Sequence, residues 1–240
     1  MQNVFLIGAM KCGTNTLYHA LRRHPHVATP KTKELDFFVS GAVDQPYASH
    51  FDIVAETQIT LDGTTQYSKH PTIRFMPDAI YAMNPQAIIF YMMRDPIDRV
   101  ESQIAHHIAR GEGITADNWR GSTRFQNAVR YSAYYTQVSL YARLFDHKRL
   151  YLGIFENFIA DQTEYIRDIC SFVGLDSQLA EVRDETRNPR RGDHGADEFR
   201  LDPEDEAELA GRLADDISCL EETFDVDTSP WKRFQKAVAA

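Results

Sequence analysis

Apolar residues gather along the chain into short continuous runs, each followed by a glycine, an arginine or a turn. The clearest runs cover residues 4–7, 87–93 and 150–155. Continuous runs of this length, rather than alternating ones, are typical of strands that are covered on both faces of a parallel sheet. We therefore predict three core strands, of which 87–93 (AIIFYMM) has the strongest pattern.

Helical spacing of apolar positions fills most of the chain between and after these runs. The predicted helices cover residues 15–23, 71–83, 96–110, 161–173 and 203–224, and residues 125–146 are predicted to be mostly helical. Residues 26–58 are mixed and predict short strands with much loop, and 111–124 and 176–200 predict loops. Because strands alternate with helices, we predict an α/β fold with a central parallel sheet flanked by helices. No linker or repeat divides the pattern, so residues 1–240 are expected to form one domain.

The charge is uneven and limits the classes of partner. The formal net charge is −9, and residues 193–225 carry thirteen acidic side chains against two arginines. This block predicts the solvated face of a C-terminal helix, and a chain without a basic stripe is not expected to bind nucleic acid. Three widely spaced cysteines give no zinc-type spacing and favour a reducing compartment. The short apolar run at residues 4–7 is expected to be a core strand rather than a leader. No run approaches the ~18 apolar residues of a membrane span, so we expect a cytoplasmic protein without membrane contact.

A glycine-bearing loop follows the first predicted strand and opens the first predicted helix. Its sequence, residues 8–17, is GAMKCGTNTL. Backbone N–H groups and a helix N-terminus at such a turn attract a phosphate. Gly8 and Gly13 have the spacing of a nucleotide-phosphate loop, but Thr14 stands where the lysine belongs and the lysine is Lys11. This placement argues against an ATP or GTP enzyme, while an ordinary turn with a chance lysine stays an alternative.

A second anion-binding pattern follows the strongest predicted strand. Arg94 comes directly after residues 87–93, at the strand end where open α/β sheets place ligands, and Ser102 follows eight residues later. Arginine grips a phosphate with two parallel hydrogen bonds, and serine adds a hydroxyl donor. A third basic segment, RNPRRG at residues 187–192, fits either a phosphate-binding loop or a solvated loop beside the acidic helix.

The two patterns together, GAMKCGTNTL and RDPIDRVES, resemble those of the PAPS-dependent sulfotransferases, in their bacterial and heparan-sulfate-type branch. PAPS is 3′-phosphoadenosine 5′-phosphosulfate. The resemblance implies a three-layer architecture like that of P-loop kinases, PAPS as co-substrate, PAP as product and no metal. It implies that Lys11 stabilises the leaving phosphate at the bridging oxygen. The residues implied to bind the nucleotide are Lys11, Gly13, Thr14, Asn15 and Thr16 at the 5′-phosphate, and Arg94, Ser102, Arg190, Arg191 and Gly192 at the 3′-phosphate.

The segment KELDFF at residues 33–38 resembles the K-E-x-x-F-F stretch of the same family. By this resemblance Glu34 is the catalytic base on the acceptor, which suits an in-line sulfuryl transfer that needs one proton acceptor near sulfur. Asp36 stands where many relatives have histidine. A surface role for Glu34 stays open, and His50 and His70 are weaker candidates for the acceptor site.

The segment DGTTQY at residues 62–67 falls where relatives have E-K-[ST]-P-x-Y. Gly63 replaces the lysine that contacts the acceptor, and Thr65 replaces the proline. The nucleotide residues are unaffected by these changes, but the acceptor class is left open. A small-molecule or carbohydrate acceptor is expected, and the pattern leaves the oligomeric state open.

Two other functions compete with sulfuryl transfer from PAPS to a hydroxyl or amine. A small-molecule P-loop kinase would need magnesium and an acidic residue at a strand end, a role for which only Asp95 or Asp62 is placed. A non-catalytic PAP or PAPS binder would keep the phosphate residues and need no base. The position of Lys11 disfavours the kinase, and the presence of Glu34 disfavours the pure binder.

Overall fold

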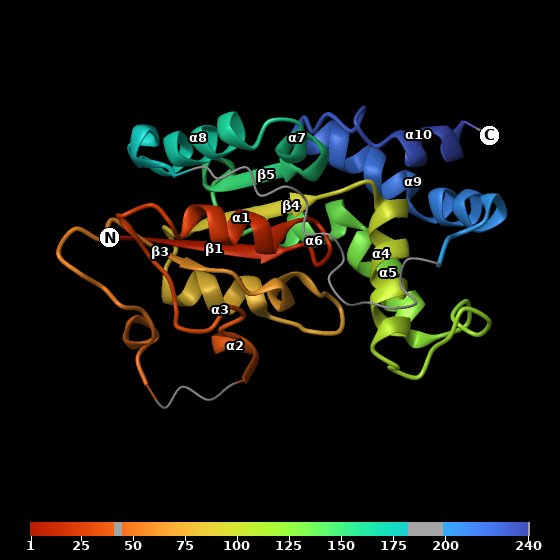
Figure 1. Ribbon diagram of the computed structural model, residues 1–240, viewed down its shortest axis with the longest axis horizontal. Coiled ribbons are helices and arrows are strands. Elements are labelled where there is room, and N and C mark those ends of the chain that lie inside the picture. Colours follow the sequence, from red (N-terminus) through yellow and green to blue (C-terminus); the bar gives the residue numbers. More distant parts are fainter. Residues whose placement is uncertain (41–44, 182–198, 240) are drawn as a thin grey trace. The chain divides into compact units, whose positions relative to one another are not determined.

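A five-stranded parallel sheet forms the centre of the fold (Figure 1), in a computed structural model that describes residues 1–40, 45–181 and 199–239. The strand order is β2-β3-β1-β4-β5, and every neighbouring pair is parallel. The strands are β1 (Gln2–Gly8), β2 (Val27–Ala28), β3 (Ile59–Asp62), β4 (Ile88–Met93) and β5 (Leu150–Ile154). Every residue of β4 is buried, which confirms the strongest strand prediction.

The described residues group into two compact units. One holds Met1–Met93 and Val138–Asp184, and the other holds Arg94–Gln137 and Glu185–Ala240, each without the residues outside the description. The sheet lies entirely in the first unit. The division of the chain between Gln137 and Val138 falls within one helix, α6 (Tyr134–Ala142).

Helices cover both faces of the sheet in the first unit. The crossovers from β1 to β2 and from β3 to β4 run in opposite directions, so right-handed connections place α1 and α3 on opposite faces. Figure 1 shows the strands between these two helices, and α8 contacts α1. The helices of this unit are α1 (Thr14–Leu21), α2 (Phe37–Ser40), α3 (Met76–Met83), α7 (Phe155–Ala160) and α8 (Gln162–Val173). Short 3₁₀ turns cover Tyr47–His50, Thr65–Ser68, His147–Arg149 and Ser177–Leu179.

The second unit is a cluster of helices. They are α4 (Pro96–Ala109), α5 (Thr123–Ser132), α9 (Pro203–Phe224) and α10 (Lys232–Val238). The long acidic helix α9 matches its predicted bounds, and a capping box formed by Asp202 and Asp205 fixes its start. It packs against α4, α5 and α10. Among the described residues, no helix has both the length and the apolar character needed to cross a membrane.

Two predicted helices differ from the structure. The helix predicted over residues 71–83 begins only at Met76, because Phe75 adopts a left-handed backbone conformation with a φ of 65°. The mostly helical stretch predicted over 125–146 forms two helices, because at Ala133 the backbone leaves helical geometry. Asp216 of α9 then accepts hydrogen bonds from the backbone N–H groups of Tyr135 and Thr136, at 2.8 and 2.9 Å, and caps the new helix start.

Candidate active site

The loop between β1 and α1 has the backbone geometry of an anion cradle. Lys11 and Gly13 both adopt left-handed conformations, with φ of 73° and 74°. A side chain at Gly13 would meet the ring of Phe155 at 2.5 Å, so this position requires glycine for space as well as for conformation. Gly13 is also the N-cap of α1 and offers no side chain to the first N–H groups of the helix. Those groups are therefore placed to bind a phosphate, which fits the residue set predicted for the 5′-phosphate.

Hydrogen bonds to β4 and from the Thr65–Ser68 turn hold this loop and the strand before it in place. The N–H group of Ala9 donates to the Met92 carbonyl of β4 at 2.7 Å, and the Ser68 hydroxyl donates to the Ile7 carbonyl at 2.7 Å. Cys12, within the loop, is fully buried. The remaining predicted members differ in exposure: Thr14 is buried, Thr16 is half-buried and Asn15 is exposed.

Glu34 lies in the loop before α2, in the same unit. Its backbone is left-handed with a φ of 61°, and Asp36 is left-handed as well, with a φ of 53°. Such conformations are uncommon for residues with a side chain and gather at functional sites. The Glu34 side chain is 35% exposed, so its carboxylate is accessible to an acceptor while still being held by neighbouring groups.

The groups that hold Glu34 were not predicted from the sequence as site residues. The backbone N–H of Thr65 donates to one carboxylate oxygen at 2.7 Å, and the Thr65 hydroxyl lies 3.2 Å from both oxygens. Lys33 adds a salt bridge at 3.1 Å. One signal in the sequence could have predicted this contact. Thr65 stands where the family pattern has proline, and threonine has a backbone N–H that can donate a hydrogen bond, whereas proline has none.

A buried carboxylate is hydrogen-bonded, through one threonine, to the loop that carries Glu34. Asp62, at the end of β3, accepts a hydrogen bond from the Thr64 hydroxyl at 2.6 Å and from the Tyr67 hydroxyl at 3.1 Å. The Thr64 oxygen in turn accepts the backbone N–H of Asp36 at 3.2 Å. This chain of bonds connects the end of β3 to the loop that carries Glu34. Burial raises the pKa of Asp62 to about 6, against the lowering effect of its hydrogen bonds.

The raised pKa makes a prediction about stability. An unfolded aspartate titrates near pH ~3.9, so between about pH 4 and 6 the folded protein binds the proton of Asp62 more tightly than the unfolded chain does. The contribution of Asp62 to stability is therefore greatest below about pH 4 and falls as the pH rises toward 6. For Asp62→Asn, the unfolding free energy relative to wild type should rise by about 2–3 kcal/mol across this window.

Urea unfolding of both proteins at several pH values between 4 and 7 measures this difference. Asp52→Asn is the matched control, because Asp52 is exposed in the same unit. A difference between Asp62→Asn and wild type that stays constant with pH would contradict the assignment.

Gly63 lies against the ring of Tyr18. A Cβ atom at this position would meet Cδ2 of Tyr18 at 2.6 Å and Cε of Lys33 at 3.3 Å. The Lys33 ammonium lies 5.6 Å from the centre of the same ring. Tyr18 and Lys33 therefore occupy the space beside position 63, where the family pattern has its acceptor-contacting lysine.

The weaker acceptor-site candidates have other neighbours. Asp36 accepts a hydrogen bond from Gln66 at 2.9 Å, and burial raises its pKa. His50 ends a 3₁₀ turn and packs edge-on against Phe37, with ring centres 5.5 Å apart. His70 lies in the turn before Pro71.

Arg94 and Ser102 belong to the second unit. Arg94 follows β4 directly in the chain, and Tyr134 donates a hydrogen bond to its carbonyl at 2.7 Å. Its guanidinium lies 3.6 Å from the Asp98 carboxylate, and a quarter of its side chain is exposed. Ser102 lies half-buried on α4. The predicted residues Arg190, Arg191 and Gly192 lie outside the described residues.

The two acids considered for a magnesium role are both buried and hydrogen-bonded. Asp95 caps α4 by accepting from Ile97 and also accepts from the backbone of Phe234. Asp62 is held by the threonine and tyrosine hydroxyls described above. Neither carboxylate faces solvent, and this does not favour the kinase alternative.

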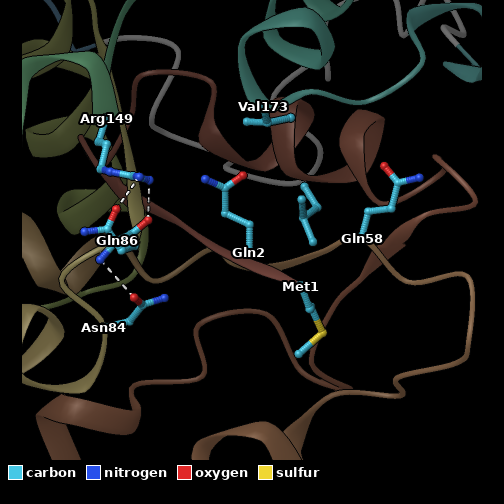
Figure 2. A pocket seen from close by; sticks show the side chains of 8 residues that line it. Met1, Gln2, Gln58, Asn84, Gln86, Arg149 and Val173 are labelled. Atoms are coloured by element: carbon cyan, nitrogen blue, oxygen red, sulfur yellow. Dashed lines mark hydrogen bonds between the residues drawn. The ribbon is translucent and has the colours of Figure 1, made fainter.

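An open hollow of about 580 Å³ lies beside the amino ends of the strands, at the opposite end of the strands from the phosphate loop (Figure 2). Arg149 lies beside Gln86 at one side of the hollow and donates to the Gln86 carbonyl at 2.6 Å. The described residues that line it are Met1, Gln2, Gln58, Ile59, Asn84, Gln86, Arg149 and Val173. None of them is an acid, a histidine or a thiol, and open α/β sheets bind ligands at the carboxyl ends of strands. The lining and the position of this hollow therefore do not favour it as the site of chemistry.

Comparison with known proteins gives a family match. The family model described as "Sulfotransferase domain" matches residues 1–189. The human proteins named heparan sulfate glucosamine 3-O-sulfotransferase 6 and 3B1 are 23% and 24% identical over 71% and 73% of this chain. The matches cover 51% and 46% of those proteins, so the chain spans about half the length of the curated relatives it matches.

Solved structures share the fold. The crystal structure of a sulfotransferase from Alicyclobacillus acidocaldarius has a TM-score of 0.76 and 23% identity, and the match covers 97% of this chain and 99% of that chain. A sulfotransferase domain from the curacin biosynthetic pathway has a TM-score of 0.55 and 12% identity, covering 100% and 98% of the two chains. Both neighbours support the predicted α/β class. With the family match over most of its length, the chain belongs to the sulfotransferase domain family.

Proposed function

We propose that this protein transfers the sulfuryl group of PAPS to a hydroxyl, or an amine, of a carbohydrate or small-molecule acceptor. The observation that carries the proposal is the phosphate cradle, in which Lys11 supplies the cation from within the left-handed turn that Gly13 completes. A nucleotide triphosphatase loop has its lysine after the second glycine, and this chain has Thr14 there.

The proposed roles follow from the chemistry of each group. PAPS supplies an activated sulfuryl group on its 5′-phosphate. The acceptor oxygen forms a bond to sulfur while the bond between sulfur and the bridging oxygen breaks, and PAP leaves. Glu34 accepts the proton that the acceptor hydroxyl loses, and Lys11 stabilises the charge that develops on the leaving phosphate. Arg94 and Ser102 bind the 3′-phosphate.

The acceptor is proposed to be a hydroxyl compound, because the human relatives are named for 3-O-sulfation of a heparan sulfate sugar. Because Gly63 replaces the lysine of the family pattern, this chain lacks that cation at the acceptor side of the site. Lys33 is the nearest described cation to Glu34 and is already paired with it. An acceptor with few negative charges therefore suits this site better than a heavily sulfated chain.

Calorimetric titration with PAP tests the nucleotide part of the proposal. PAP should bind with or without EDTA, and more tightly than ATP. Arg94→Ala should weaken PAP binding by about 1.5–3 kcal/mol, the scale for a lost charged hydrogen-bonding partner. Strict dependence on magnesium, or preference for ATP, would exclude the proposed function. Equal PAP affinity in Arg94→Ala would remove Arg94 from the 3′-phosphate.

A further inference from the structure

Arg233, at the start of α10, contacts three carboxylates at once. Its guanidinium lies 2.6 Å from Asp98, 3.0 Å from Glu101 and 2.6 Å from Glu206. The first two acids lie on α4 and the third on α9, so one cation neutralises acids from two helices. Only 29% of the Arg233 side chain is exposed, so solvent screens its attraction to these carboxylates less than it would on an open surface.

The backbone around Arg233 is bound to the start of α4. The N–H groups of Arg233 and Phe234 both donate to one carboxylate oxygen of Asp95, at 2.9 and 3.0 Å. The other oxygen of Asp95 accepts the N–H of Ile97 and caps α4. α10 is therefore fastened to the turn that immediately follows Arg94.

A second contact links the same segment to Arg94 itself. Trp231 is fully buried and packs against Tyr134, with ring centres 5.5 Å apart. The Tyr134 hydroxyl donates to the Arg94 carbonyl at 2.7 Å. This C-terminal segment lies beyond residue 189, where the match to the family model ends.

Asp98 is shared between two arginines. One of its oxygens lies 2.6 Å from Arg233, and the other lies 3.6 Å from Arg94. An Asp98 carboxylate without Arg233 would pair more fully with Arg94 and would oppose an incoming phosphate there. Glu101 and Glu206 would also lose this cation, and Glu101 would keep its longer contact with Arg200, at 3.7 Å.

We infer that Arg233 is a positioning residue for nucleotide binding: it neutralises Asp98 so that the Arg94 guanidinium serves the 3′-phosphate. The inference rests on the proposed function, in which Arg94 binds that phosphate. It assigns the C-terminal helix α10 a role in the nucleotide site that the family match does not cover.

The test is a double-mutant cycle on PAP affinity, measured by calorimetry with a melting curve for each variant. Arg233→Met should weaken PAP binding about tenfold, and adding Asp98→Asn should restore most of that loss. Arg212→Met is the matched control. Arg212 pairs with Glu208 at 3.5 Å on the surface of α9 in the same unit, and its loss should leave PAP affinity unchanged. The melting curves separate the positioning role from a merely structural one, in which the loss of PAP affinity would follow a loss of thermal stability.

Two results of the cycle would overturn the inference. The first is a folded Arg233→Met protein with wild-type PAP affinity, and the second is a double variant as weak as Arg233→Met alone. If Arg233→Met does not fold, Asp98→Asn alone decides: equal or tighter PAP binding supports the inference, and weaker binding overturns it. A wild-type protein that does not bind PAP at all removes the proposed function, and the inference with it.

Discussion

Replacing Glu34 by glutamine is expected to lower turnover by about 10²–10⁴-fold, the range for loss of a general base. Glutamine keeps the shape of the side chain and can still accept the hydrogen bond from the Thr65 N–H. It cannot accept the proton of the acceptor. PAP affinity should barely change, because in the proposed mechanism Glu34 acts on the acceptor and not on the nucleotide.

The measurement needs an acceptor, which a screen with labelled PAPS against carbohydrates, phenols, lipids and tyrosine peptides would supply. Glu56→Gln is the matched control, because Glu56 is exposed in the same unit. Turnover near the wild-type value in Glu34→Gln would show that the bonds to Thr65 and Lys33 make Glu34 a structural anchor. The search for the base would then move to Asp36, His50 and His70.

Replacing Lys11 by alanine should give a different signature, in which turnover and nucleotide binding both fall. Turnover is expected to fall about 10²–10³-fold, as when one charge-stabilising donor is removed from a transition state. PAP affinity should fall as well, because the ammonium also attracts the ground-state phosphate. Alanine keeps the Cβ atom, so the left-handed backbone at this position is equally strained in both proteins.

Single-turnover kinetics with PAPS and calorimetry with PAP separate the two effects. Lys31→Ala serves as the control, since Lys31 is exposed near the loop that carries Glu34. A Lys11→Ala protein that loses affinity but keeps its turnover number would show that Lys11 only binds the nucleotide. In that case another group must stabilise the leaving phosphate.

The strands with continuous apolar sequence were predictable, and those with polar residues were not. β1, β4 and β5 appear within one or two residues of their predicted bounds. β3 was missed because its sequence, ITLD, alternates apolar and polar residues although all four are buried. The buried Asp62 is satisfied by hydroxyls that only tertiary structure brings to it, so no local pattern could identify it.

The same distinction applies to the candidate site. The phosphate loop is local in sequence, and its glycine positions reflect backbone needs that the structure confirms at Gly13. The contact of Thr65 with Glu34 joins residues 31 positions apart, and Arg233 contacts Asp98 from 135 positions away. Contacts of this kind depend on chain topology, which periodicity does not encode. α10 was also missed, because seven residues are too few for a clear helical period.

The ring of Tyr18 over Gly63 restricts the order in which this chain can change. A lysine introduced alone at position 63 would drive its Cβ atom to within 2.6 Å of the ring. The buried ring would have to shift, and a smaller residue at position 18 would remove this clash. The two positions are therefore epistatic, and the effects of their substitutions will not add. An evolutionary or engineered path from this protein to a lysine at position 63 is therefore easier when the substitution at Tyr18 precedes the lysine.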